Sequence, residues 1–302
     1  MKLYAPKYYK DFKCIADKCT HSCCVGWEID VDEKTLKKYE AVTAPYAEQL
    51  NNSIEYGGTP HFKLCEGERC PHLDEKGLCR IITELGEAYL CDICREHPRF
   101  YNDTGLGREV GLGMSCEEAC RIILSSDEYA DMIEVGRARG KSRVPRFDTL
   151  THREWIYSVL SDGAVPYEKR IGMIGERYRV SLSERNDSNF RELLASLEYL
   201  DEAHKELFSC YTSDVSTPQE FEKPLERALA YFIYRHCAEV ESADEIRASV
   251  GFCLFCERLL ASLLKNREFT VTGAMIGAAV AVSEEIEYSE DNTEIIKNEF
   301  WF

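Results

Sequence analysis

The density of cysteine in the first 120 residues constrains this chain more than any other feature. The sequence has 302 residues and fifteen cysteines, and eleven of these cysteines lie between Cys14 and Cys120. The N-terminal segment lacks the apolar stretch of a secretory signal, so we expect a cytoplasmic protein, where thiols stay reduced. An odd number of cysteines also fits poorly with complete pairing into disulfides. The cysteines therefore predict a metal site rather than a disulfide framework.

Charge and hydropathy argue against two other classes of function. The formal net charge is −17, and no run of Lys and Arg forms a basic stripe, so we expect no nucleic-acid partner. No stretch of about 18 apolar residues occurs, and we therefore expect no transmembrane segment. The acidic surface favours solubility, and it would also attract a lysine-bearing protein.

Composition changes near residue 140 and predicts two domains. Residues 1–140 are rich in Cys, Gly and turn signals, which indicates an irregular Cys-rich metal-binding module with short strands, one of them near 109–114. Residues 141–302 show apolar residues at helical spacing, which indicates a helical domain. The predicted fold class is mainly α, with the Cys-rich N-terminal module packed on a helical C-terminal half.

Capping signals locate several helix starts. A capping box at Ser242–Glu245 and a related pattern at Thr217–Glu220, with Pro218 at the first helical position, each precede apolar residues at helical spacing. A third box, Ser115–Glu118, would place Cys116 in the first turn of a helix, where the partial positive charge lowers the pKa of a thiol. Further helices are expected at 32–50, 150–161, 165–178, 188–209 and 270–288.

The N-terminal cysteines form closely spaced groups that can converge on one metal ion or cluster. The groups are Cys14-x4-Cys19-x3-Cys23-Cys24, Cys65-x4-Cys70-Pro-His-Leu, Gly77-Leu-Cys79, Cys91-x2-Cys94 and Cys116-x3-Cys120. Zinc and iron–sulfur clusters are both usually held by four thiolates. A buried apolar role is the alternative for Cys65 and Cys120, and it is favoured for Cys253 and Cys256, which lie in an apolar helical pattern.

These groups resemble those of zinc- or iron-chelating proteins of the CxxCxxCC type. Within that group the chain is most similar to the flagellin lysine-N-methylase family. The shared features are Phe12-Lys-Cys14, Cys23-Cys-x-Gly-Trp27, Cys94-Arg-x-x-Pro98-Arg99, Glu109-Val-x-Leu-x-Met-Ser-Cys116 and the segment from Glu226 to His236. The resemblance implies methyl transfer from S-adenosylmethionine to lysine amines of flagellin, or of another lysine-bearing protein, by an enzyme with an iron–sulfur cluster, most simply 4Fe-4S.

The cysteines that match these motifs are the candidate metal ligands: Cys14, Cys19, Cys23, Cys24, Cys70, Cys79, Cys94 and Cys116. Eight thiols suit two four-cysteine sites, whereas a single site would use fewer, and zinc remains the alternative metal. Arg99 is a candidate for binding a carboxylate of the cofactor, and Glu109 is either a second cofactor-binding residue or the partner of Arg99. No residue stands out as the catalytic base. The alternative function is a non-catalytic zinc- or iron-binding protein that senses redox state.

Overall fold

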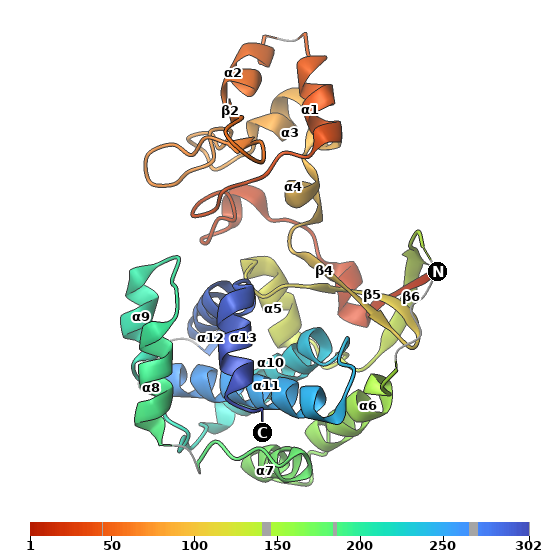
Figure 1. Cartoon of the computed structure of the whole chain (residues 1–302), viewed down its shortest axis with the longest axis vertical. Helices are drawn as coiled ribbons and strands as arrows, with labels where there is room; N and C mark the ends of the chain where they lie inside the picture. The colour runs from red at the N-terminus through yellow and green to blue at the C-terminus, as the bar shows by residue number, and fades with distance from the viewer. Residues whose placement is uncertain (44, 141–145, 184–185, 266–270, 302) are drawn as a thin grey trace. The chain divides into compact units, whose positions relative to one another are not determined.

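The chain forms two compact units in the computed structural model, which describes residues 1–43, 45–140, 146–183, 186–265 and 271–301 (Figure 1). The cysteine-rich unit comprises Lys13–Arg99, and the helical unit comprises Met1–Phe12 together with Phe100–Phe302. The change in composition near residue 140 therefore falls inside the helical unit. Residues 141–145, in the polar stretch at that point, lie outside the described residues.

The helical unit contains a four-stranded sheet whose strands are far apart in the sequence. The strand order is β4-β5-β1-β6, and β1 pairs in parallel with β5 and antiparallel with β6. Only the segment corresponding to β5 is predicted from the sequence. Pairing of the N-terminal strand with two later strands brings the first residues of the chain into the helical unit. The bounds are Lys2–Pro6 (β1), Arg99–Thr104 (β4), Gly107–Leu112 (β5) and Met132–Arg137 (β6).

Helices make up most of the remaining helical unit, as the apolar periodicity predicts. Two of the predicted helices are interrupted: 188–209 forms α8 and α9, and 270–288 forms α12 followed by a π-helical turn at Ser283–Glu287. The bounds are Glu117–Ser125 (α5), Thr149–Leu160 (α6), Tyr167–Tyr178 (α7), Asp187–Ser196 (α8), Glu202–Phe208 (α9), Gln219–His236 (α10), Ala243–Leu264 (α11), Val271–Val282 (α12) and Glu290–Asn298 (α13).

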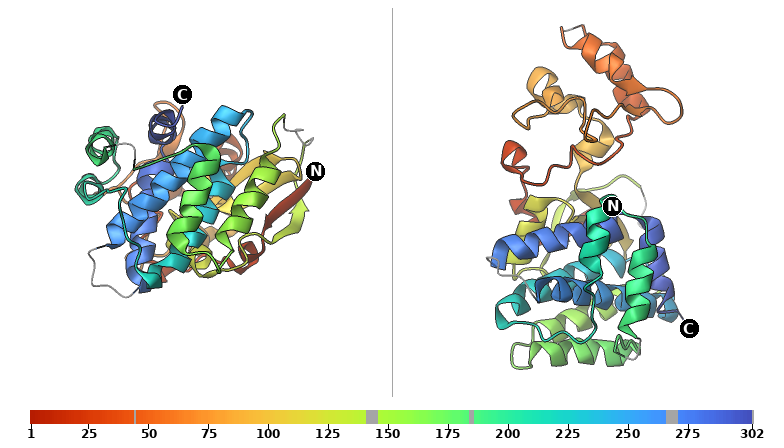
Figure 2. Two further views of the ribbon diagram at one scale, coloured as in Figure 1. Left: turned by 90° about the horizontal axis from the view of Figure 1, so that it is seen from below. Right: turned by 90° about the vertical axis from the view of Figure 1, so that its left-hand side faces the viewer.

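Helices α10 and α11 form the centre of this unit. They pack against each other, and α5, α6, α7, α12 and α13 surround them (Figure 2). Every residue of α11 from Ala248 to Leu264 is buried, which is the pattern of a helix covered on all sides. Phe300 docks on this core, since the Cβ of a residue larger than Gly251 would overlap its ring. Phe302 lies outside the described residues.

The predicted helix starts have mixed outcomes. The Ser242 hydroxyl accepts a hydrogen bond from the Glu245 amide at 3.1 Å, which confirms this cap. The start predicted at Thr217 is wrong by one residue. Pro218 has an extended ψ of 141°, so it is the N-cap of α10, and the helix begins at Gln219. Cys116 likewise has an extended ψ of 121°, so it is the N-cap of α5 in place of Ser115.

The cysteine-rich unit has short elements and a small apolar core. The helix predicted over 32–50 is two helices, and the one pair of strands described here is two residues long on each side. The core contains Ile29, Val31, Tyr39, Leu50 and Phe62. The bounds are Glu33–Glu40 (α1), Ala47–Asn52 (α2), Ile54–Glu55 (β2), His61–Phe62 (β3), Arg80–Leu85 (α3) and Asp92–Glu96 (α4).

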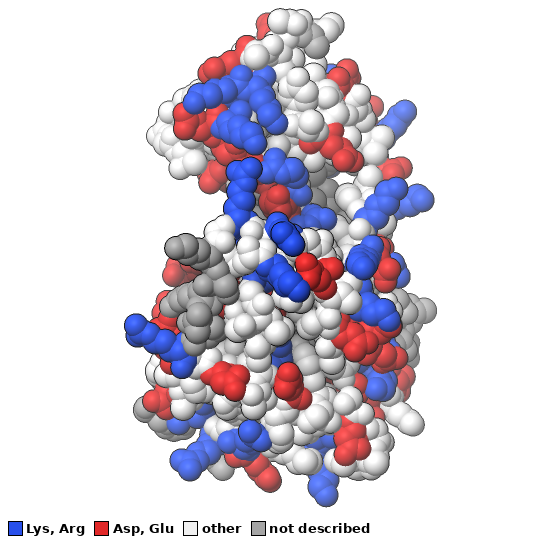
Figure 3. All heavy atoms as spheres, turned by 90° about the vertical axis from the view of Figure 1, so that its right-hand side faces the viewer, with Lys and Arg blue, Asp and Glu red and all other residues white. Residues whose placement is uncertain are grey.

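None of the helices in the described part of the chain combines the length and the apolar character needed to cross a bilayer. On the face drawn in Figure 3, basic and acidic side chains both occur on each unit.

Candidate functional site

The cysteine-rich unit brings five thiols into one electrostatic neighbourhood. Each of these thiols influences the pKa of others in the group, and all five pack in or against the same apolar core. The Cys70 amide donates to the Cys24 carbonyl at 2.8 Å, which ties two distant motifs together. The five are Cys24, Cys70, Cys79, Cys91 and Cys94, and we call them the thiol group.

Short helices present two members of the thiol group at their N-termini. Cys79 is the N-cap of α3 and Cys91 is the N-cap of α4. Burial raises the pKa of Cys79 and outweighs the nearby backbone amides of Ile82 and Ile81, which favour the thiolate. Burial also raises the pKa of Cys70 to about 12. These thiols would therefore need a bound cation to become thiolates at neutral pH.

In two pairs of neighbouring thiols, an interaction between the sulfurs lowers the pKa of one member of the pair. The Cys24 thiol bonds to Cys23, and this bond, with smaller help from Ser22 and Arg69, lowers the pKa of Cys24 to about 7. In the second pair, the hydrogen bond between Cys91 and Cys94 lowers the pKa of Cys91 and raises that of Cys94. One thiol of each pair is thus the first to ionise.

The remaining predicted ligands are not members of the thiol group. Cys14 and Cys23 are exposed, and the Cys19 thiol donates to the His21 carbonyl at 2.8 Å. Cys116 belongs to the helical unit, where it is the N-cap of α5. The prediction did not include Cys91, although its spacing from Cys94, C-x2-C, is the signal that could have found it.

A metal fits the chemistry of the thiol group, because zinc and iron–sulfur clusters both prefer cysteine sulfur. Among the described residues, no three His, Cys, Asp or Glu side chains are arranged to hold one metal ion. The ligand set, the metal and the number of sites therefore stay predictions. His72, next to Cys70, already has both ring nitrogens bonded, to Tyr46 and Ser53, so it is a satisfied core residue.

The two residues predicted to bind cofactor differ in their surroundings. Arg99 begins β4, and its guanidinium donates to the Arg95 carbonyl at 3.4 Å. Glu109 is fully buried, and its two oxygens each accept from Arg153 at 2.7 Å. Arg153, and not Arg99, is thus the partner of Glu109. A role for either residue in binding cofactor stays a prediction.

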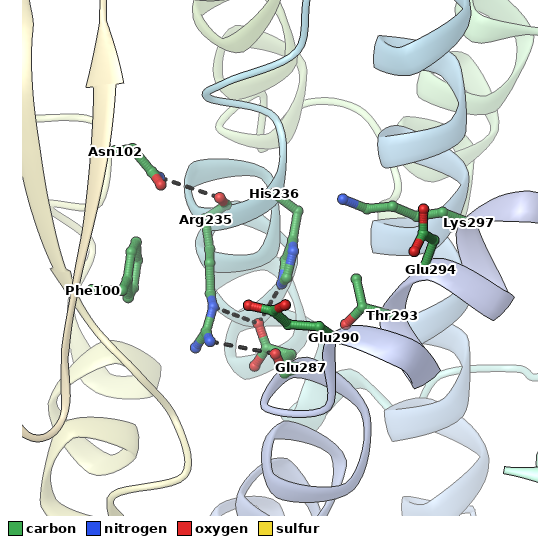
Figure 4. Close-up of a pocket in the computed structure, with 9 residues that line it drawn as sticks. All are labelled: Phe100, Asn102, Arg235, His236, Glu287, Glu290, Thr293, Glu294 and Lys297. Atoms are coloured by element: carbon green, nitrogen blue, oxygen red, sulfur yellow. Dashed lines mark hydrogen bonds and ion pairs between the residues drawn. The ribbon is translucent and has the colours of Figure 1, made fainter. Parts of the chain in front are cut away.

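A pocket of about 380 Å³ opens in the helical unit (Figure 4). Its walls come from β4, from the C-terminal end of α10, from the π-helical turn and from α13. In Figure 4, the α13 side chains lie on one side and those of β4 and α10 on the other. The lining residues are Phe100, Asn102, Arg235, His236, Glu287, Glu290, Thr293, Glu294 and Lys297.

Aromatic rings and two glycines hold Arg235 in place on the pocket wall. Its guanidinium carbon lies 5.0 Å from the centre of the Phe100 ring and 4.5 Å from that of Tyr288. A Cβ at Gly111 would overlap the Phe100 ring, and one at Gly113 would overlap the Tyr288 hydroxyl. These close approaches require glycine at both positions, which gives the Gly111-x-Gly113 pair a packing role.

Glu287 is a buried carboxylate at the inner end of the pocket. Its oxygens contact His236 Nε2 at 2.7 Å and the Tyr231 hydroxyl at 3.1 Å, and Arg235 Nε lies 3.7 Å away. Burial would raise the pKa of Glu287, but Arg235 and His236 more than offset this and lower it. Burial lowers the pKa of His236 to about 4, so a neutral imidazole donates its Nε2 proton to the carboxylate.

Two sequence motifs that carry the family resemblance meet at this pocket. The segment from Glu109 contributes Gly111, which packs against Phe100 of the pocket wall, and the segment ending at His236 contributes Arg235 and His236 to the lining. Glu287 gave no signal in the sequence, because only the fold brings it next to residues about fifty positions earlier.

Comparison with known proteins found three similar curated proteins. The flagellar biosynthetic protein FliU of Salmonella muenchen is 28% identical over 162 residues, which cover 51% of this chain and 94% of FliU. Proteins named Lysine-N-methylase from Salmonella choleraesuis and Salmonella typhimurium are each 28% identical over 137 residues, or 43% of this chain. The matched region spans 34% of each lysine-N-methylase.

No family profile and no solved structure matches the chain. The similarity to curated proteins agrees with the resemblance that the cysteine motifs predict. The chain is therefore a distant homologue of the lysine-N-methylases and of FliU.

Proposed function

We propose that this protein is an iron–sulfur-dependent protein-lysine N-methyltransferase that uses S-adenosylmethionine, with flagellin as its substrate. The observation that carries the proposal is the similarity to two proteins named Lysine-N-methylase. The similarity to a flagellar biosynthetic protein favours a flagellar substrate over other lysine-bearing proteins.

The thiol group supports the iron–sulfur part of the proposal. Its five members come from four separate motifs and share one neighbourhood, which is more thiols than one four-cysteine site needs. Cys24, Cys70, Cys79, Cys91 and Cys94 would supply the ligands. When bound, a cluster supplies an electron-transfer group and, at an iron without a cysteine ligand, an open coordination position. The chain's own contribution is to bury the ligands and to place Cys79 and Cys91 at helix N-termini.

Lysine methylation also requires a neutral amine positioned in line with the methyl donor. A desolvated site favours the neutral amine, and a carboxylate or an imidazole can accept the proton that the amine loses. The pocket of the helical unit offers carboxylates and a neutral imidazole close together, which suits such an environment.

The test is transfer of labelled methyl groups. Reduced holoprotein, purified without oxygen, is incubated with S-adenosylmethionine labelled in the methyl group and with flagellin. Flagellin with acetylated lysines is the matched control. Label on lysine of unmodified flagellin, with no label on the acetylated control, supports the proposal. No transfer by protein with an intact metal centre contradicts it and favours a non-catalytic zinc- or iron-binding role.

A further inference from the structure

The pocket of the helical unit presents charges of both signs toward its opening. Glu290 and Glu294 lie one turn apart on α13, and Lys297 follows on the next turn. Within the described part of the chain, neither carboxylate makes an ion pair or a hydrogen bond. Lys297 makes no ion pair there either, and its ammonium lies 5.7 Å from the centre of the Phe252 ring.

The inner end of the pocket contributes little net charge, because Arg235 and Glu287 offset each other and His236 is neutral. The charges that remain for a ligand are therefore two carboxylates and one ammonium. A ligand with a single cation would leave Lys297 without a partner. A ligand that carries both a carboxylate and an ammonium would match all three side chains.

We propose that this pocket binds the zwitterionic amino-acid end of a small ligand. Lys297 pairs with the ligand carboxylate, and Glu290 and Glu294 pair with its ammonium. The volume of about 380 Å³ lies in the range of small-molecule sites. The inference rests on the proposed function in one respect: the ligand it names is S-adenosylmethionine, whose methionine part carries both groups.

The wall opposite α13 is suited to hold such a ligand because its side chains are closely packed and hydrogen-bonded. Arg235 is held between the Phe100 and Tyr288 rings and hydrogen-bonds to the Tyr231 hydroxyl at 3.0 Å. The π-helical turn at Ser283–Glu287 directs Glu287 inward, and turns of this kind are frequent at functional sites. Side chains that are already held in place cost less entropy to order when a ligand binds.

The test is a calorimetric titration of the holoprotein with S-adenosylhomocysteine, which measures the affinity of the pocket for this probe. This probe carries the same amino-acid end and has no methyl group to transfer. We expect Lys297→Met, and the double variant Glu290→Gln/Glu294→Gln, each to weaken binding by about tenfold or more. Asp291→Asn is the matched control, because Asp291 is an exposed carboxylate of α13 outside the pocket. It should change the affinity by less than about twofold.

A second probe reports on the carboxylate alone. Decarboxylated S-adenosylhomocysteine should bind the wild type more weakly, and Lys297→Met should remove that difference. Equal affinity of the wild type and the pocket variants would overturn the inference. In that case, loss of binding on removal of the metal would show that the amino-acid end is held at the metal centre. The proposed function would then stand without this inference. Failure of the probe to bind the wild type overturns the inference as well.

The proposed function can fail while this inference holds. Binding that depends on Lys297, without transfer of methyl groups to flagellin, would support the pocket and contradict the methyltransferase. The two experiments therefore separate the two claims.

Discussion

Cys91 and Cys94 lie at the N-cap and in the first turn of one short helix. Cys91 is the N-cap of α4 and is buried, and the hydrogen bond from Cys94 lowers its pKa. A thiol that ionises readily beside four others is well placed to bind a metal.

We therefore predict that Cys91→Ser weakens metal binding by at least about tenfold. Cys65→Ser is the control, because Cys65 lies in the same unit but is exposed. Iron and zinc content per chain, measured after gel filtration, checks this prediction. Equal metal content in the two variants would show that Cys91 is not a ligand.

Arg153 neutralises the fully buried carboxylate of Glu109. Replacing only Arg153 with Met leaves a buried charge without a partner, so we expect a loss of about 3–5 kcal/mol in the free energy of unfolding. The double variant Glu109→Gln/Arg153→Met removes both charges and should recover part of that loss. Denaturant unfolding of both variants measures the difference. A single variant as stable as the wild type would contradict this assignment.

Strand β5 shapes the pocket through Gly111, which packs against the ring of Phe100. Gly111→Ala would push the Phe100 ring from its position, and overpacking of this kind costs about 1–3 kcal/mol. Gly136→Ala in β6 is the matched control, since a Cβ there meets no atom within 4 Å. Thermal unfolding should show a lower melting temperature for Gly111→Ala than for the wild type, and no such decrease for Gly136→Ala. Equal melting temperatures would mean that the ring has room to move.

The helices were predictable because each repeats its apolar residues about every turn. The sheet was not, because β1 is only five residues long and its pairing with β5 and β6 depends on contacts over a hundred residues apart. The pocket was missed for the same reason. Arg235 and His236 lie in a motif visible in the sequence, whereas Glu287 reaches them only through the π-helical turn.

The two units differ in what stabilises them. The helical unit has an extensive apolar core, whereas the core of the cysteine-rich unit is small. Metal binding would then supply much of the folding free energy of the cysteine-rich unit.

We predict that chelation of the metal raises amide hydrogen exchange throughout residues 13–99. The buried helices α10 and α11 of the helical unit should keep their protection and serve as an internal control. Hydrogen exchange read by mass spectrometry checks both units in one sample. Unchanged protection of the cysteine-rich unit would contradict a structural role for the metal.

We propose that the thiol group holds an iron–sulfur cluster. Iron, zinc and acid-labile sulfide, measured together on protein purified without oxygen, test it most directly. We expect iron and sulfide in equal amounts, because a 4Fe-4S cluster contains as many sulfides as irons. Zinc without sulfide would contradict the claim.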